Sequence, residues 1–290
     1  MRRRRAGNLS HSAPGVNFLG FLFMQRASKY SLPPHLLNLL IIGFSLLTAL
    51  LLWQCLIWLG GFPAYILPPP TAVWARFLKS LADGSLLRNS LITLYEVLVG
   101  LTLGVCSASI LGYRLAKSVR LERMLSPYIV ASQSIPVVAI APLLVIWFGP
   151  GLTSKVLICA LIVFFPVLIN TIVGMRSVPD DLRDLMRSLG ATRWQTFRLL
   201  EVHAALPVLF GGLRIGATLA VIGAVVGEFV ASDRGLGFLI NVARGLYDTS
   251  LVFVAVLTLV VMAMGLYGLV VLLESRLLSW QQPRENTVIQ

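Results

Sequence analysis

Long apolar segments are the feature that most constrains how this chain can fold. Six runs approach the ~20 residues that a helix needs to cross the hydrocarbon core of a bilayer. Of the 290 residues, 57% are hydrophobic and 12% are charged, whereas soluble domains carry roughly 25% charged residues. We therefore expect an all-α polytopic membrane protein. The expected spans are Leu36–Leu59, Leu91–Leu115, Leu125–Phe148, Lys155–Met175, Val208–Ala231 and Leu251–Leu273.

The distribution of Lys and Arg predicts the orientation of these spans. With the N-terminus inside, seventeen Lys and Arg side chains lie on the inner side and six on the outer side. The positive-inside rule then places both termini in the cytoplasm. We expect a cytoplasmic or interfacial arm at 1–35, a six-helix domain at 36–275 and a cytoplasmic tail at 276–290. The apolar patch in the arm is too short to span, and we do not expect a cleaved signal.

Residues 177–207 form the longest polar-rich passage between apolar runs, and the pattern predicts two short amphipathic helices hinged at Gly190. Thr192 followed by Gln195 is a capping-box pattern that restarts the helix. Trp194 and Phe197 share the apolar face of the second helix. Two interpretations are open. The passage is either a protruding element that docks on a partner, or an ordinary solvated loop with interfacial helices. The apolar stripe of the first helix is Leu182, Leu185, Met186 and Leu189.

Two of the expected spans carry helix breakers. Proline inside a spanning helix frees carbonyl groups, which is tolerated only against protein or a wet cavity. Gly212-x-x-x-Gly216 and Gly223-x-x-x-Gly227 allow helix backbones to approach closely. These two spans are our candidates for lining a transport pathway, with plain bundle packing as the alternative. The candidate pathway and gate residues are Gln133, Pro136, Pro142, Trp147, Gly223, Gly227 and Glu228.

Ionisable residues at membrane depth are rare and therefore informative. Glu96 lies near the outer start of the second span, and Glu228 lies near the outer end of the fifth. For Glu228 one interpretation is an outer gate or dimer-contact carboxylate, paired with Arg234 or Arg244. The other is a residue that snorkels at the rim of the membrane.

Several chemistries find no support in the sequence. It has no Gly-x-x-x-x-Gly-Lys-Ser/Thr phosphate loop, and its three cysteines and three histidines show no ligand spacing. We expect no catalytic residues, no metal and no cofactor held by this chain. The arginine-rich passage 182–200 also fits a DNA-binding helix-turn-helix, but both of its ends run into spanning helices. We therefore expect no nucleic acid partner.

Residues 177–207 resemble the cytoplasmic "EAA" loop of the permease subunits of bacterial binding-protein-dependent ABC importers, and we call them the coupling loop. Gly190 matches the glycine of that loop, and Asp184 stands in place of its glutamate. Leu185 and Met186 replace the two alanines. At the end of the motif, Leu200, Val202 and His203 stand for its isoleucine, leucine and proline.

Other blocks between about residues 60 and 275 resemble the nitrate, sulfonate and taurine branch of these permeases. They include FPAYILPPPTAVW, APLLVIWFG, SLGATRWQTF and GLRIG…GEF…GLGFLI. The resemblance implies a type I importer permease in the bacterial inner membrane, with a coupling loop that docks on a cytoplasmic ATPase. The implied coupling residues are Asp184, Leu185, Met186, Leu189, Gly190, Ala191, Thr192, Arg193, Trp194 and Phe197.

The same resemblance implies partners and a transport mechanism. It implies cytoplasmic ABC ATPase subunits that hold ATP and Mg, an extracytoplasmic solute-binding protein, surrounding lipid, and a second permease subunit, for which we expect another copy of this chain. We expect alternating-access import of a small organic or inorganic anion such as a sulfonate or nitrate, with a thiamine precursor or other cofactor-like solute as the alternative. Two other classes are an ion-gradient-driven carrier or channel, suggested by Glu96 and Glu228, and a membrane scaffold or sensor.

Overall fold

The computed structural model describes residues 34–278, and the chain divides into two compact units at residues 59 and 60. In the first unit the described element is α2 (Pro34–Gly60), an unbroken apolar helix. From residue 40 its side chains are almost all exposed, as expected of a helix that faces lipid. The expected arm at 1–35, apart from its last two residues, and residues 279–290 of the expected tail lie outside the described residues. The domain boundaries therefore stay predictions.

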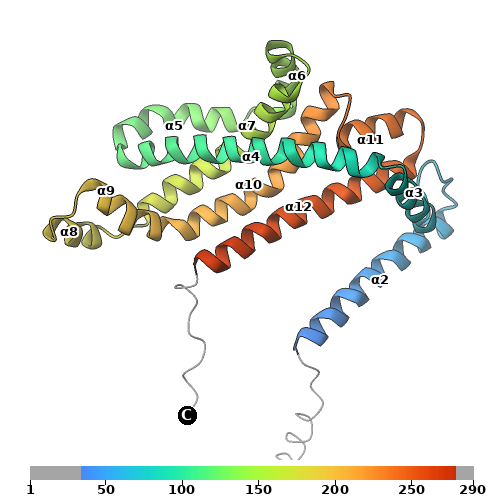
Figure 1. Cartoon of the computed structure of the whole chain (residues 1–290), viewed down its shortest axis with the longest axis horizontal. Helices are drawn as coiled ribbons and strands as arrows, with labels where there is room; N and C mark the ends of the chain where they lie inside the picture. Colours follow the sequence, from blue (N-terminus) through green and yellow to red (C-terminus); the bar gives the residue numbers. More distant parts are fainter. Residues whose placement is uncertain (1–33, 279–290) are drawn as a thin grey trace, which may run out of the picture. The chain divides into compact units, whose positions relative to one another are not determined.

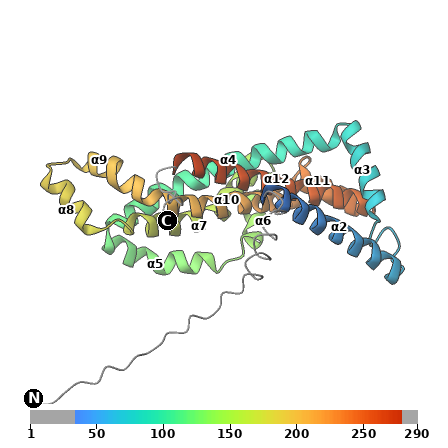
Figure 2. The same cartoon turned by 90° about the horizontal axis from the view of Figure 1, so that it is seen from below.

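The second unit is a helical bundle with short helices at both ends. Figures 1 and 2 show α8 and α9 at one end of the bundle and α3 and α11 at the opposite end. The coupling loop is therefore far from the turn that joins α10 to α11. The elements are α3 (Pro70–Ala82), α4 (Ser85–Lys117), α5 (Val119–Gln133), α6 (Val137–Phe148), α7 (Leu152–Arg176), α8 (Asp180–Ser188), α9 (Arg193–Thr196), the π-helical segment η2 (Phe197–Glu201), α10 (Val202–Ala231), α11 (Leu236–Gly245) and α12 (Thr249–Leu277).

The helices confirm the all-α polytopic fold, with one correction to the expected spans. In the part of the chain that the structure describes, five helices are long and apolar enough to cross a membrane. The expected third span is instead broken into α5 and α6, which are bent by 96° relative to each other. Pro136 lies at the break and adopts an extended ψ of 118°. A proline also lacks the N–H needed to continue the helical hydrogen bonding.

Helix α7 lies at the centre of the bundle and packs against α4 on one side and α10 on the other. Glycines make both contacts close, because a Cβ at Gly104 of α4 would lie 2.8 Å from the carbonyl oxygen of Ala160. On α10, a Cβ at Gly223 would lie 2.7 Å from the Cα of Cys159. The close backbone approach expected for the Gly-x-x-x-Gly pairs is confirmed, and α7 is the partner.

We expect Gly223→Ala to destabilise the bundle, because the new methyl group meets the backbone of α7 rather than a flexible side chain. Overpacking of this kind typically costs about 1–3 kcal/mol. Gly211→Ala is the matched control on the same helix, since nothing lies within 4 Å of a Cβ at Gly211. Unfolding in mixed micelles measures both variants. Equal unfolding free energies for the two variants would contradict the packing described here.

Candidate functional site

The first half of the coupling loop is the helix α8. Asp180 and Asp181 lie in its first turn and Arg187 lies in its last turn. Acidic groups at the start and a basic group at the end interact favourably with the helix dipole and stabilise the helix. The helix ends at Ser188, and Gly190 two residues later has a left-handed φ of +71°, at the hinge that the sequence predicted. Ala191 N donates to the carbonyl oxygen of Met186 at 3.0 Å and closes this turn.

The second half of the coupling loop begins with the expected capping box. Thr192 N donates to Gln195 Oε1 at 2.7 Å, and Gln195 N donates to Thr192 Oγ1 at 3.3 Å. These two bonds satisfy amide groups that the start of a helix leaves unpaired. The helix α9 is one turn long and passes into the π-helical segment before α10. The hinge and both helix ends are therefore encoded locally.

The coupling loop presents large apolar side chains on its surface. Leu185, Leu189 and Trp194 are 53%, 72% and 66% exposed. The ring of Trp194 packs on Phe197 with a centroid distance of 5.4 Å. Exposed apolar groups gathered at one place are typical of an interaction surface. Of the expected coupling residues, Asp184, Leu185, Leu189, Gly190, Thr192, Arg193 and Trp194 are exposed, and Met186, Ala191 and Phe197 are half-buried.

A buried ion pair lies at the opposite end of the bundle. Lys155 Nζ of α7 donates to Glu96 Oε1 of α4 at 2.6 Å, and both side chains are almost fully buried. Lys155 also donates to Ser232 Oγ, just after α10, at 2.9 Å. A buried charge is tolerated when it is paired and hydrogen-bonded. Lys155 therefore joins α7 to α4 and to the segment that follows α10.

Glu228 of α10 lies beside this pair and is only 1% exposed. Its Oε1 accepts from Thr93 Oγ1 of α4 at 2.6 Å, and its Oε2 accepts from Gly237 N of α11. The carboxyl group lies against Gly235, where any Cβ would collide with it and where φ is +106°. Only glycine fits both the left-handed backbone and the contact with Glu228. We call Thr93, Glu96, Lys155, Glu228 and Ser232 the α11 cluster.

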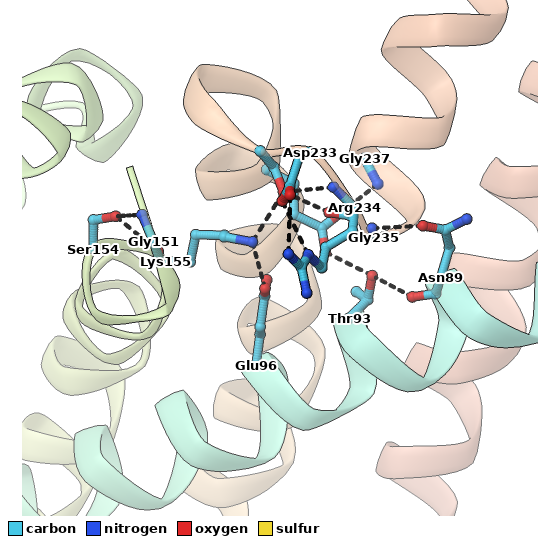
Figure 3. A network of polar contacts seen from close by, with 12 residues as sticks. Asn89, Thr93, Glu96, Gly151, Ser154, Lys155, Asp233, Arg234, Gly235 and Gly237 are labelled. Atoms are coloured by element: carbon cyan, nitrogen blue, oxygen red, sulfur yellow. Dashed lines mark hydrogen bonds and ion pairs between the residues drawn. The ribbon is translucent and has the colours of Figure 1, made fainter. Parts of the chain in front are cut away.

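Side chains of the α11 cluster and its neighbour Asn89 hold the start of α11 (Figure 3). Gly235 N donates to Asn89 Oδ1 at 2.7 Å. Leu236 N donates to Thr93 Oγ1 at 2.8 Å. With the bond from Gly237 to Glu228, three successive amides at this helix start find side-chain acceptors. Because unpaired amides lie at every helix N-terminus, these bonds fix α11 onto α4 and α10.

The structure corrects the expected partners of Glu228 and its placement at the rim, whereas its role as an outer gate or dimer contact stays a prediction. Its bonds run to Thr93 and Gly237 rather than to Arg234 or Arg244, and its burial is not that of a residue at the rim. Arg234 instead donates to both carboxylate oxygens of Asp233 at 3.0 Å. These bonds hold the pKa of Asp233 below its ordinary value and raise the pKa of Arg234.

A cavity of about 880 Å³ lies next to the α11 cluster. Its charged lining groups are Glu96, Lys155, Asp233 and Arg234. The charges alternate and pair with each other, Lys155 with Glu96 and Arg234 with Asp233. The cavity therefore offers both signs of charge and no excess of either.

The expected pathway residues fall into two groups. Gln133, Pro136, Pro142 and Trp147 are exposed on α5, on α6 and at the break between them. Gly223, Gly227 and Glu228 are buried on α10, where both glycines face α7. The seven residues therefore do not share one surface within this chain. Across residues 34–278, no group of three His, Cys, Asp or Glu side chains could hold a metal ion.

Residues 100–279 match the family described as "Binding-protein-dependent transport system inner membrane component". The chain belongs to this family. The riboflavin transport system permease protein RibX of Chloroflexus aurantiacus is 53% identical over 237 residues, which is 82% of this chain and 88% of RibX. The putative aliphatic sulfonates transport permease protein SsuC of Bacillus subtilis is 33% identical over 235 residues, 81% of this chain and 85% of SsuC. A chain of the solved MetNI methionine ABC transporter in an inward-facing conformation aligns with a TM-score of 0.57 at 20% identity, covering 69% of this chain and 97% of that chain.

This importer permease is thus a multi-pass protein of the inner membrane and a transport component without an ATPase site of its own. The resemblance of its coupling loop and apolar blocks to ABC importer permeases is confirmed. The sequence did not reveal the partners of the buried charges. Thr93 and Glu96 are one helical turn apart and form a polar face in the sequence. Lys155, however, starts the expected fourth span and counts among the six outer Lys and Arg side chains.

Proposed function

We propose that this permease and a second copy of it form the pore of an ATP-driven importer. An extracytoplasmic solute-binding protein delivers the solute, and cytoplasmic ATPase subunits bind the exposed apolar groups of the coupling loop. Closure of the ATPases on ATP moves α8 and α9, and the bundle alternates between outward and inward access. The membership in the importer family and the exposed Leu189 and Trp194 support this proposal.

The proposed orientation places both termini and the coupling loop in the cytoplasm. The excess of Lys and Arg on that side supports it. Because α8–α9 and α11 lie at opposite ends of the bundle, this orientation puts α11 on the side opposite the coupling loop (Figures 1 and 2). The α11 cluster then lies at the extracytoplasmic end.

The proposed solute is a cofactor-like organic molecule of the flavin type rather than a sulfonate. The observation that carries this choice is the identity of 53% with RibX, against 33% with SsuC over nearly the same length. Riboflavin is an uncharged heteroaromatic molecule under neutral conditions. The balanced charges beside the cavity at the α11 cluster suit such a solute better than a single-sign patch would.

Uptake of radiolabelled riboflavin in cells with and without this permease tests the choice of solute. We expect deletion of the permease to abolish ATP-dependent riboflavin uptake, and excess taurine or methanesulfonate to leave uptake in the intact strain unchanged. Loss of sulfonate uptake with normal riboflavin uptake would overturn the proposed solute. Uptake into vesicles that contain the permease but no ATPase would instead overturn the importer mechanism and favour an ion-gradient carrier.

A further inference from the structure

A buried carboxylate lies where the coupling loop joins α10. Glu201 is the last residue of the π-helical segment and is only 2% exposed. An ionised carboxylate out of contact with water needs cations and hydrogen bonds close by. Two cations from different helices supply this environment, Lys117 from the end of α4 and Arg183 from α8.

The end of α4 contacts the π-helical segment at both of its ends. Lys117 Nζ donates to Glu201 Oε1. One turn earlier on α4, the ring of Tyr113 meets the ring of Phe197 edge to face, with a centroid distance of 5.0 Å. Lys117 also lies over the ring of Tyr113, 5.7 Å from its centroid. Two α4 residues four positions apart, Tyr113 and Lys117, therefore contact two residues four positions apart on the π-helical segment, Phe197 and Glu201.

Arg183 connects α8 to the same carboxylate and to α7. Its Nε lies 3.8 Å from Glu201 Oε1, and its Nη2 donates to the carbonyl oxygen of Met175 at 2.9 Å. A third contact, from Nη1 to Asp180 Oδ1 at 3.0 Å, holds the guanidinium group in place. The side chain thus fixes α8 relative to the end of α7 and faces Glu201.

We infer that Glu201 is a positioning residue for energy coupling, which transmits movement of α8 to α4 and α7 as well as to α10. The inference rests on the proposed docking of the ATPase at the coupling loop. The covalent chain links the loop to α7 and α10 alone, whereas Glu201 and its two cations add a link to α4. Movement of the coupling loop is then transmitted to α4, α7 and α10 together.

The π-helical backbone at this place fits such a role. Segments with π-type hydrogen bonding are rare and often mark functional sites. Here the π-helical turn directs both Phe197 and Glu201 toward α4. A packed interface of this kind has discrete arrangements rather than a continuous range, so it transmits a movement instead of absorbing it.

Glu201→Gln in the complete complex with ATPase and solute-binding protein tests the inference, because it keeps the shape and removes the charge. We expect the complex to assemble and to keep its basal ATP hydrolysis. We expect stimulation of hydrolysis by the solute-binding protein to fall about tenfold, a factor that corresponds to a typical coupling free energy between two sites. Lys117→Gln changes a side chain that is 43% exposed, and we expect a smaller loss in the same direction. The double exchange Lys117→Glu with Glu201→Lys is expected to restore part of the stimulation.

Glu122→Gln is the matched control. It breaks the ion pair with Arg176, which joins α5 to α7 at the same end of the bundle but is more exposed, and we expect stimulation close to that of the wild type. Full stimulation in both Glu201→Gln and Lys117→Gln would overturn the inference while leaving the docking intact. Should Glu201→Gln fail to assemble, full stimulation in Lys117→Gln alone would overturn it. Normal ATPase binding after loss of the exposed Trp194 side chain would instead overturn the proposed docking.

Discussion

Trp194→Ala is expected to weaken assembly with the ATPase subunits strongly while leaving the permease folded. The indole is 66% exposed in the chain alone, so its removal takes little from the core. Buried aromatic anchors dominate protein interfaces, and truncation of one typically costs about 2–4 kcal/mol of binding free energy. We therefore expect a loss of affinity of roughly 30-fold to 1000-fold. Co-purification and titration of the ATPase against detergent-solubilised permease measure it.

Trp58→Ala is the matched control for this experiment. Trp58 is 81% exposed, but it lies on α2 and outside the coupling loop. We expect this variant to bind the ATPase as the wild type does. Equal ATPase affinities for Trp194→Ala and wild type would show that the exposed face of the coupling loop is not the docking surface.

Lys155→Met is expected to destabilise the permease strongly, because it leaves Glu96 buried without its cation. The two side chains are 6% and 2% exposed and are joined at 2.6 Å. Removal of one partner from a buried ion pair typically costs about 3–5 kcal/mol. Unfolding in mixed micelles should show the loss of free energy, and membrane insertion levels should fall with it.

The double variant Lys155→Met with Glu96→Met distinguishes two causes of the lost stability, the unpaired charge of Glu96 and the altered packing. A buried ion pair can be replaced by apolar side chains with little change in stability, so we expect the double variant to recover most of the loss. Arg234→Met removes a cation that is 55% exposed at the same end of the bundle, and we expect little effect. A double variant as unstable as Lys155→Met would mean that packing, rather than the unpaired charge, sets the cost.

The sequence predicted the helices well because spanning helices and their ends are encoded locally. Apolar runs of sufficient length define the spans, and Gly190 and the Thr192–Gln195 box define the hinge of the coupling loop. The sequence does not specify the bend of 96° between α5 and α6. Pro136 predicted a weakness in the third span, but the direction of the chain after it depends on what α6 packs against.

The charged partners could not be read from the sequence, because they are far apart along the chain. For Glu228 the sequence suggests the nearby Arg234 or Arg244 as partner, whereas its partner Thr93 is 135 residues away. Nothing in the local sequence distinguishes Glu201 from other acids of the coupling loop, because its partner Lys117 is 84 residues away. Such pairs depend on how α4, α7 and α10 are stacked, which a pattern of residue types does not specify.

Labelling of a cysteine at position 189 tests most directly that the coupling loop is the cytoplasmic docking site of the ATPase. The background carries Cys55→Ala and Cys106→Ala, since these two cysteines are exposed and Cys159 is buried. Leu189→Cys is then treated with a membrane-impermeant maleimide in intact cells and in inside-out vesicles. We predict labelling in inside-out vesicles only, and protection of the thiol when ATPase subunits are added. Labelling in intact cells, or labelling that bound ATPase does not block, would contradict the proposed docking.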